Sequence, residues 1–301
     1  MDITFTDDSG SSGAITEVKD GAALLVAEMN TQSMEGITIK GGVLTPGNHT
    51  INLTATNYYD VVVNQSMGHV YTGEGEGSLS HPYLIATAAQ LNEVRYHLEV
   101  GNHYKLTVDI DLNGYADCDG WIPIGDINNK FQGNMDGNGF IITNLTINRA
   151  NSGCIGLFGY TGSRSSISNL SLENIDVNGY YDVGGLVGNN NGTINNSYTM
   201  GTSSGAYCNI GGLVGNNNGL ISNSYSTGNM SGMFYTGGLV GLNAGLISCS
   251  YAIGNVEGTS KVGGLVGSND QGIINNSFYD TEATGQSDKI QKKVKARQLK
   301  K

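Results

Sequence analysis

Proline, charge and cysteine are all scarce in this chain of 301 residues. With only 3 prolines, the 46 glycines do not fit collagen or proline-rich linkers, and they indicate a turn-rich β protein instead. No apolar run approaches the ~18 residues that a membrane-spanning helix needs, so we expect no such helix. The 4 cysteines are too few and too scattered for a disulfide framework, which favours free, buried thiols.

Charged residues make up only 14% of the chain, and their two signs are unevenly distributed. Residues 289–301 hold 7 of the 15 basic residues and no acid, which leaves 8 basic residues against 26 acids, a balance of −18. An acidic body argues against nucleic-acid binding, which needs a basic face. The basic end is either a solvated tail or a segment that docks on the acidic body of a neighbouring copy.

The most informative feature is a glycine-rich phrase that occurs four times. The copies contain Gly-Gly-Leu-Val-Gly and span Val183–Gly188, Ile210–Gly215, Thr236–Gly241 and Val262–Gly267. They restart after 27, 26 and 26 residues, and a degenerate copy, Ile155–Gly159, precedes them. A fixed repeat of about 20–50 residues is typical of solenoids.

Each repeat contains only short segments between polar corners. The phrase is followed by an Asn/Gly corner, a strand such as Gly219–Tyr225, and a third short segment such as Gly228–Gly232. Glycine recurs every few residues, and each one disfavours helix by about 1 kcal/mol. Gly and Asn also supply the positive φ angles of sharp corners. The pattern therefore predicts an all-β chain in which each repeat is one coil of a right-handed parallel β-helix solenoid.

Stacked coils place equivalent side chains in columns. The strands align an aliphatic column of Ile194, Ile221, Ile247 and Ile274. Two residues further on they align an amide column of Asn169, Asn196, Asn223 and Asn276, interrupted by Cys249. Residues two apart on a strand share a face, so we expect the amides to lie inside with the isoleucines and to donate to one another. A third column holds Tyr198, Tyr225, Tyr251 and Phe278, which we interpret as packing rather than as a ligand platform.

The unit GGLVGxNxGxIxNSY resembles the GLUG repeat of bacterial and archaeal secreted and surface proteins. The phrases that usually precede such repeats are also present, at Gly77–Leu91, Tyr104–Leu112, Trp121–Gly125 and Phe131–Gly139. The resemblance covers roughly residues 73–287. It implies a parallel β-helix in an adhesin-like, stalk-like or matrix protein. It carries over no catalytic residue, because the family motif is a packing motif.

The chain is predicted to have four parts. Residues 1–72 are predicted to form a small Ig-like β-sandwich. The sequence there predicts short strands separated by turn residues, at Gly36–Lys40, His49–Ala55 and Tyr59–Val63. Residues 73–103 contain a glycine-rich joint and a helix, residues 104–288 form the β-helix, and residues 289–301 form the basic tail.

The predicted helix follows the joint and would cap the solenoid. Thr87 and Gln90 have capping-box spacing, and Leu91, Val94 and Leu98 form an apolar stripe. A solenoid must hide its first open coil, so we interpret the stripe as core. Trp121, the only tryptophan, is expected to be a buried wedge rather than a sugar-stacking platform.

Candidate chemistry is sparse. The acidic residues of the repeats do not align in one column, and all five histidines precede the repeats, so we expect no catalytic residue and no enzyme. A loop rich in oxygen ligands is a calcium candidate, with turn-capping by its carboxylates as the alternative. The candidate ligands are Asp111, Asn113, Asp117 and Asp119, beside Asp109. No other cofactor is implied.

Nine Asn-X-Ser/Thr sequons occur, and those expected to be exposed could carry glycans. These are Asn48, Asn52, Asn64 and Asn191.

The favoured function is that of a non-catalytic extracellular or cell-surface protein. It would be a rigid β-helical rod for adhesion or display, or a unit that self-assembles into a filament, sheath or matrix. Its partners would be further copies, other surface proteins or glycans. The alternative is a carbohydrate-binding or polysaccharide-degrading β-helix.

Overall fold

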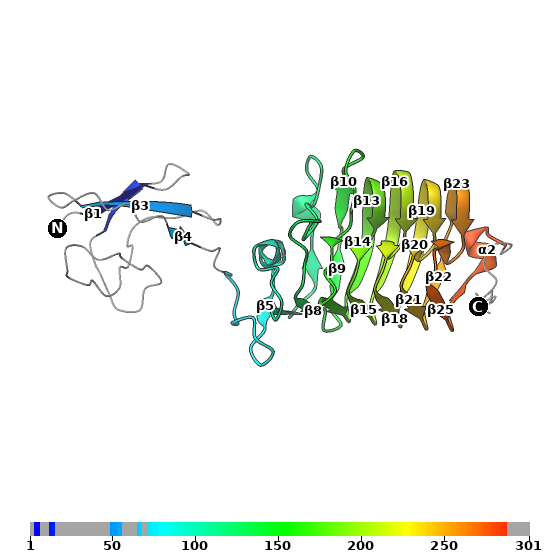
Figure 1. Ribbon diagram of the computed structural model, residues 1–301, viewed down its shortest axis with the longest axis horizontal. Helices are drawn as coiled ribbons and strands as arrows, with labels where there is room; N and C mark the ends of the chain where they lie inside the picture. The colour runs from blue at the N-terminus through cyan, green and yellow to red at the C-terminus, as the bar shows by residue number, and fades with distance from the viewer. Residues whose placement is uncertain (1–2, 7–11, 16–48, 56–64, 68–70, 288–301) are drawn as a thin grey trace. The chain divides into compact units, whose positions relative to one another are not determined.

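The computed structural model describes residues 3–6, 12–15, 49–55, 65–67 and 71–287 (Figure 1). The chain divides into two units, Met1–Val70 and Tyr71–Lys301. The basic tail, residues 289–301, lies outside the described residues.

The first unit contains one described antiparallel sheet in the order β2-β1-β3-β4. Its strands are β1 (Ile3–Thr6), β2 (Ser12–Ile15), β3 (His49–Ala55) and β4 (Gln65–Met67). The predicted strand at His49–Ala55 is confirmed as β3. The other two predicted strands, Gly36–Lys40 and Tyr59–Val63, lie outside the described residues, as do the sequon residues Asn48 and Asn64.

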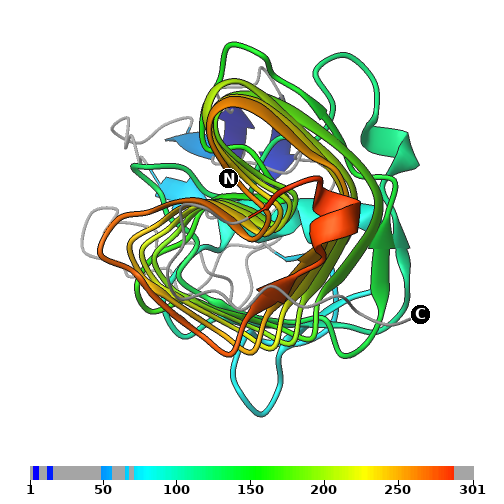
Figure 2. The same ribbon diagram turned by 90° about the vertical axis from the view of Figure 1, so that its right-hand side faces the viewer.

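The second unit is an all-β parallel solenoid of about 7 turns, built from three parallel sheets (Figures 1 and 2). Sheet I has 8 strands: β5 (Tyr83–Ile85), β6 (His103–Leu106), β8 (Asn134–Asp136), β12 (Ser166–Ser168), β15 (Thr193–Asn195), β18 (Leu220–Ser222), β21 (Leu246–Ser248) and β25 (Ile273–Asn275). Sheet III has 5 strands: β11 (Phe158–Tyr160), β14 (Val187–Asn190), β17 (Val214–Asn217), β20 (Val240–Asn243) and β24 (Val266–Asn269).

Sheet II has 9 strands, three of them unusually long. It contains β7 (Ile110–Asp111), β9 (Ile141–Thr143), β10 (Thr146–Asn148), β13 (Ser171–Gly184), β16 (Tyr198–Gly211), β19 (Tyr225–Gly237), β22 (Tyr251–Ile253), β23 (Val256–Gly263) and β26 (Phe278–Tyr279). One coil runs from sheet I through sheet II to sheet III, as in β15, β16 and β17. The repeat of three short strands inferred from the sequence is therefore confirmed, although the sheet II segment is longer than expected.

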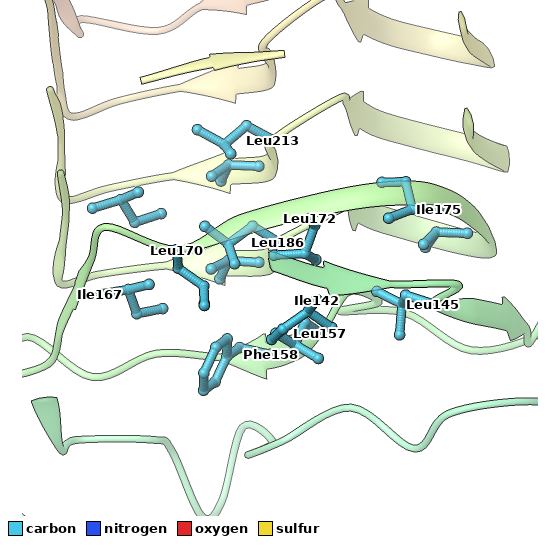
Figure 3. Packing of buried hydrophobic residues seen from close by; sticks show 14 of the residues in the cluster. Ile142, Leu145, Leu157, Phe158, Ile167, Leu170, Leu172, Ile175, Leu186 and Leu213 are labelled. Atoms are coloured by element: carbon cyan, nitrogen blue, oxygen red, sulfur yellow. The ribbon is translucent and has the colours of Figure 1, made fainter. Parts of the chain in front are cut away.

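Aliphatic columns fill the interior of the coils. The strands pair Ile194 with Ile221, Ile221 with Ile247, and Ile247 with Ile274, while Val187, Val214 and Val240 align in sheet III. Figure 3 shows leucine and isoleucine side chains of successive coils packed above one another. A fully buried aliphatic side chain contributes about 1.5–3 kcal/mol, and each coil supplies several.

The predicted inward amide column is wrong, because its residues lie at a corner. Asn169, Asn196, Asn223, Cys249 and Asn276 all have positive φ, between 47° and 52°. Asn169 is half-buried and the other four are exposed. The strand of sheet I ends one residue earlier, at Asn195 in β15, so the two-residue alternation that places isoleucines inside does not continue. At the surface Asn196 Nδ2 still donates to Asn169 Oδ1, at 2.7 Å.

A different amide column lies inside. Asn190 Nδ2 donates to Asn217 Oδ1 at 2.8 Å, Asn217 Nδ2 to Asn243 Oδ1 at 2.8 Å, and Asn243 Nδ2 to Asn269 Oδ1 at 2.7 Å. We call these four residues the amide ladder. Thr161 begins it, because its hydroxyl donates to Asn190 Oδ1 at 2.8 Å. Asn190, Asn217 and Asn243 are fully buried, so the ladder satisfies polar groups that would otherwise be costly.

A short helix lies at the start of the solenoid. α1 (Ala88–Glu93) continues into η1 (Val94–Tyr96), and the Thr87 side chain accepts from the Gln90 backbone N–H. The Gln90 side chain reaches back to the backbone N–H of Ala86 rather than of Thr87, at 2.8 Å. Leu91 and Val94 are fully buried. No helix among the described residues is both long and apolar enough to cross a membrane.

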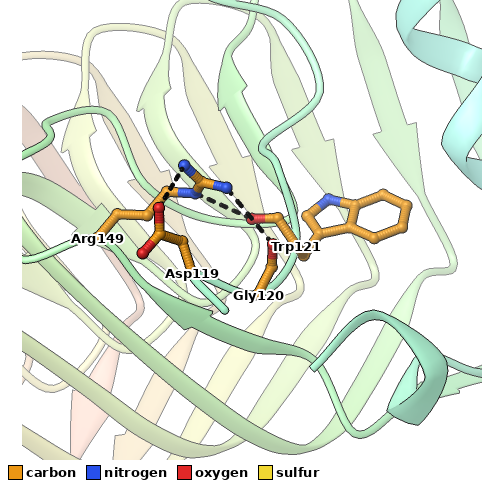
Figure 4. A network of polar contacts seen from close by, with 4 residues as sticks. All are labelled: Asp119, Gly120, Trp121 and Arg149. Carbon is orange, nitrogen blue, oxygen red and sulfur yellow. Dashed lines mark hydrogen bonds and ion pairs between the residues drawn. The ribbon is translucent and has the colours of Figure 1, made fainter. Parts of the chain in front are cut away.

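Trp121 is fully buried, as expected, and its indole N–H donates to the Leu157 carbonyl at 3.2 Å. The Arg95 guanidinium lies 5.4 Å from the ring centroid. Arg149 holds the adjoining backbone through the Gly120 and Trp121 carbonyls (Figure 4). The first irregular coils are therefore fixed around this indole.

The remaining helices are single turns. η2 (Asn113–Tyr115) lies in the loop before Trp121, and α2 (Thr281–Thr284) follows the last strand. Asp280 caps α2 by accepting from the backbone N–H groups of Glu282 and Ala283.

Candidate functional site

The calcium candidates do not converge on a metal site. Asp111 Oδ1 accepts from the Asn113 backbone N–H at 2.9 Å and from Asn144 Nδ2 at 2.8 Å, and these hydrogen bonds lower the pKa of Asp111. Asp119 pairs with Arg149 at 3.7 Å. Asp117 and Asn113 are exposed, and among the described residues no group of three His, Cys, Asp or Glu side chains could hold a metal ion. Asp111 instead fixes the turn at Asn113, in line with the alternative interpretation of turn-capping.

Two other sequence interpretations are revised by the structure. The sequon residue Asn191 is half-buried, and its Nδ2 donates to the Thr161 carbonyl at 3.2 Å and to Asn189 Oδ1 at 3.0 Å, so this amide is engaged. Asn52 lies in β3. The cysteines are free, but they are not buried: Cys118 and Cys249 are exposed, and Cys154 and Cys208 are half-buried.

The long strands β13, β16 and β19 of sheet II form an extension of their coils, seen end-on in Figure 2. Along β13 the side chains of Ile175, Val177 and Val183 are buried, so the extension has an aliphatic interior of its own. Asp182 turns the chain back with a φ of 50°, and Asn209 and Tyr235 do the same in the next two coils, with φ of 61° and 55°.

An exposed cluster of rings and one methionine lies just before this turn. We define the aromatic ridge as Tyr180, Tyr181, Tyr207, Met233 and Phe234. The exposed fractions of the first four are 41%, 43%, 45% and 45%, which is high for such large apolar groups, and Phe234 is half-buried. Solvent-exposed apolar side chains that gather at one place indicate an interaction surface more than scattered ones do.

The ridge is continuous across β13, β16 and β19. The rings of Tyr180 and Tyr207 stack with centroids 5.5 Å apart and an interplanar angle of 13°. Tyr207 meets Phe234 edge to face, with centroids 5.8 Å apart. The ridge ends at the following coil, where Ser260 pairs with Phe234. Exposed tyrosines combine an apolar face with a hydroxyl, a combination suited to sugar rings and to protein surfaces.

A one-residue bulge lies beside Tyr207 in β16. The pairing of β16 with β19 shifts between Gly205 and Cys208, where β16 has one residue more than β19. The same extra residue explains why the first two repeats are spaced by 27 residues and the later ones by 26.

The sequence contains a signal for the ridge that the strand columns do not show. Tyr180, Tyr207 and Met233 each lie three residues before the first residue of a glycine-rich phrase, at 183 − 3, 210 − 3 and 236 − 3. When residues are counted from the start of each sheet II strand, as for the tyrosine column, the extra residue in β16 moves Tyr207 out of this alignment.

A buried carboxylate lies beneath the ridge. Asp182 is only 6% exposed, and it accepts from Asn209 Nδ2 at 2.6 Å and from Asn189 Nδ2 at 3.0 Å. Burial raises the pKa of Asp182, although these amide donors act in the opposite direction. Burial, and then the nearby Asp182, raise the pKa of the Cys154 thiol to about 12, so it is not a nucleophile at neutral pH.

The tyrosine column stands apart from the ridge. Tyr198, Tyr225 and Tyr251 are half-buried and stack with centroids 4.6 and 4.7 Å apart. Phe278 pairs with Tyr251 at the end of the column. The Tyr198 hydroxyl donates to Glu173 Oε1 at 2.6 Å, and burial, followed by this bond, raises the pKa of Tyr198 to about 12. Because the rings cover one another's faces, the column offers little surface to a ligand.

A known protein family matches part of the repeat region. Residues 206–231 match the family described as the GLUG motif. The solenoid carries the GLUG motif. Residues 1–68 match a different family, described as heme-binding protein Shr-like, Hb-interacting domain.

Two relatives share the GLUG solenoid's sequence. A candidate Gly-rich membrane protein of Evansella cellulosilytica is 48% identical over 139 residues, which cover 44% of this chain and 16% of that protein. Halomucin of Haloquadratum walsbyi is 33% identical over 231 residues, which cover 67% of this chain and 2% of that protein. The chain therefore spans less than a fifth of either relative.

A solved structure shares the fold of the GLUG solenoid. A candidate immunoglobulin A1 protease from Bacteroides ovatus aligns with a TM-score of 0.54 and 22% identity, over 74% of this chain and 79% of that one. At this identity the likeness concerns the fold alone.

Proposed function

We propose that this chain is a non-catalytic structural segment of a cell-surface protein, in which the GLUG solenoid acts as a rigid rod. The observation that supports this most directly is the continuous interior. Aliphatic columns and the amide ladder run from coil to coil without interruption, and such interiors resist bending because they are densely packed. About 7 turns at ~4.8 Å per turn make a rod of roughly 34 Å.

The relatives support a surface location. One is named as a candidate membrane protein and the other as halomucin, and both are far longer than this chain. Adhesion, display, and self-assembly into a filament, sheath or matrix are the roles that such a rod can perform. We assign α1 the role of covering the first coil, because Leu91 and Val94 are fully buried against it.

The first unit would then be the binding module that the rod displays. Its match to a hemoglobin-interacting domain favours a protein-binding module over an inert Ig-like spacer. The full chain can be immobilised and exposed to hemoglobin, with serum albumin as the control protein. Binding at or below micromolar concentration would support a capture role, and equal weak signals for both proteins would contradict it.

The surface role is tested by where the protein lies and what it looks like. Antibodies to the chain should label intact cells, and protease treatment of intact cells should remove the label. Electron microscopy of the purified chain should show short rods or their assemblies. Labelling only after lysis, or turnover of a polysaccharide by the pure chain, would overturn the proposal.

Carbohydrate binding is the second candidate, and the aromatic ridge is the observation that favours it. No charged residue belongs to the ridge, so an uncharged glycan fits it better than an acidic one, which the acidic body would repel. The Tyr180→Ala/Tyr207→Ala variant should lose retention in gels that contain neutral polysaccharides. Tyr96→Ala is the matched control, because Tyr96 is 44% exposed and lies outside the ridge. Equal retention of both variants would remove this candidate.

A further inference from the structure

The tyrosine column places the same ring of successive coils face to face. Tyr198, Tyr225 and Tyr251 begin β16, β19 and β22, and they are direct partners in the pairing of these strands. Their rings are nearly parallel, with interplanar angles of 8° and 4° and centroids 4.6 and 4.7 Å apart. Neighbouring strands lie about 4.8 Å apart, so the stacking follows from the strand register.

Packing alone does not require the hydroxyl groups of these rings. Phe278 pairs with Tyr251 in the last coil, so the column accepts a ring that has no hydroxyl. Tyr198, Tyr225 and Tyr251 are half-buried, which leaves part of each residue open to solvent. The column therefore holds three phenol groups in a row that a small reagent can approach.

One of these phenols has a proton acceptor in place. The Tyr198 hydroxyl donates to Glu173 Oε1 at 2.6 Å, and Glu173 lies in β13, one coil earlier. Loss of an electron makes a phenol a strong acid, so oxidation is fastest where a positioned base takes the proton as the electron leaves. The Glu173 carboxylate is such a base.

We propose that Tyr198 and Tyr225 form a modification site, at which a one-electron oxidant converts the stacked pair into dityrosine. Each ring gives one electron to the oxidant and loses its hydroxyl proton, which passes to Glu173 from Tyr198 and to water from Tyr225. The two phenoxyl radicals form one carbon–carbon bond between positions ortho to their oxygens. The hydrogens at those two carbons move to the oxygens and restore the aromatic rings, so the pair loses two hydrogen atoms in total.

The geometry favours this bond over links between molecules. Two parallel rings with centroids 4.6 Å apart need only a small tilt for their ortho carbons to meet. Groups held in this way react as if each were present at ~10⁵ M or more, far above any protein concentration. The product joins β16 to β19 covalently, so these two coils can no longer separate.

The aromatic ridge offers an internal comparison. Tyr180 and Tyr207 also stack, but their centroids are 5.5 Å apart and the two residues are 41% and 45% exposed. If exposure decided reactivity, the ridge pair would react first. Close stacking and the Glu173 carboxylate instead place the pair of Tyr198 and Tyr225 first.

Photo-oxidation of the full chain tests the site. The dilute protein is illuminated with a ruthenium tris-bipyridine complex and persulfate, which together generate a one-electron oxidant. Dityrosine fluorescence gives the initial rate, and mass spectrometry of peptide fragments identifies the linked residues. We expect the first product to be a link between Tyr198 and Tyr225 within one molecule, with two hydrogen atoms lost.

Two phenylalanine variants show whether the column is the source of the signal. Tyr225→Phe should lower the initial rate of total dityrosine formation roughly tenfold, because Tyr198 and Tyr251 are two coils apart. The column already accommodates Phe278, so this variant should fold. Tyr160→Phe is the matched control, because Tyr160 is also half-buried but lies in β11, outside the column. It should leave the rate unchanged.

Glu173→Gln keeps the size of the side chain but removes the proton acceptor. We expect it to lower the rate about tenfold while the circular dichroism spectrum stays the same. An equal rate in this variant, or a first link between Tyr225 and Tyr251, would overturn the role given to the carboxylate.

Three results would overturn the site itself. They are a first link between Tyr180 and Tyr207, an equal rate in Tyr225→Phe and wild type, and links mainly between molecules with a yield that rises with protein concentration. The modification does not depend on the proposed surface role, so either can fail alone.

Discussion

At the scale of single residues, the amide ladder ties neighbouring coils together through side chains. Asn217 accepts from Asn190 and donates to Asn243, with both distances at 2.8 Å, and it is fully buried. Its amide group therefore links three consecutive coils by side-chain hydrogen bonds. Removing one member leaves a donor and an acceptor buried without partners, which costs more than the net value of the two hydrogen bonds.

We therefore expect Asn217→Ala to destabilise the solenoid by about 1–3 kcal/mol. The neighbouring Asn218→Ala is the matched control, because Asn218 is exposed and should change stability by less than ~0.5 kcal/mol. Urea unfolding followed by circular dichroism measures both. Equal midpoints for the two variants would show that the ladder adds nothing to stability.

Asp182 gives the solenoid a predictable response to pH. Because burial raises its folded-state pKa, the folded protein binds this proton more tightly than the unfolded chain does. The stabilisation from the proton is fully present below the ordinary pKa of an aspartate and is lost as the pH rises through the raised value. Asp182→Asn removes this dependence.

The expected result is that Asp182→Asn gains stability relative to wild type as the pH rises from about 3 to 8. Asp176→Asn, an exposed carboxylate on the same strand, provides the comparison. Melting temperatures across this range measure the difference. A constant offset between Asp182→Asn and wild type at every pH would contradict the assignment.

At the scale of the structural element, the corners decide whether a coil can stack. Gly228 and Gly254 have φ of 149° and 132°, and a Cβ on either would lie 1.8 Å from the carbonyl oxygen of the equivalent glycine in the preceding coil. Backbone conformation and close approach both exclude a side chain there. The corner therefore fixes the spacing of the coils as well as their direction.

Gly228→Ala should destabilise the solenoid by about 2–6 kcal/mol, the sum of overpacking and backbone strain. Two other substitutions separate these causes. Gly101 has φ of 93° but open space around it, so Gly101→Ala isolates the backbone strain, and Gly114→Ala has neither problem. Thermal unfolding should rank the losses Gly228 > Gly101 > Gly114. A Gly228→Ala variant as stable as Gly114→Ala would refute the corner argument.

The limits of sequence prediction are clearest at these corners. Gly-Gly-Leu-Val-Gly and the strand after it predicted the coil, the isoleucine column and the parallel stacking, because regular strands follow a simple alternation. That alternation stops wherever a residue takes positive φ, so the inward position of Asn196 was wrong and the inward position of Asn190 was missed. The aromatic ridge was missed for a related reason. The columns were aligned from the strands, and the one-residue bulge near Tyr207 shifts that alignment.

At the scale of the whole molecule, the repeat makes coils interchangeable. The strands that flank one repeat pair with the same register as those that flank the next. Deletion of residues 211–236 removes 26 residues and joins Ile210 to Gly237, which restores a complete glycine-rich phrase. We expect this variant to fold into a rod about 4.8 Å shorter.

Deletion of half as many residues, 211–223, is the matched control. It joins β16 directly to β19, two strands of sheet II, and removes β17 and β18 between them. The columns then no longer align, and the chain should not form a stable solenoid. Small-angle scattering and circular dichroism distinguish the two outcomes. If both deletions fold equally well, register between coils is not what holds the rod together.

The hydrogen bonds between coils, both of the backbone and of the amide ladder, lie nearly parallel to the long axis. A tensile load on the two ends therefore breaks the hydrogen bonds between one pair of coils at a time. The bonds of all coils do not share the load, as they would in shear. Each coil that peels away frees about 26 residues, or roughly 90 Å of slack. Under mechanical load this segment would unfold one coil at a time, in steps of equal length. A tether that lengthens in this way dissipates the energy of a sudden extension without breaking.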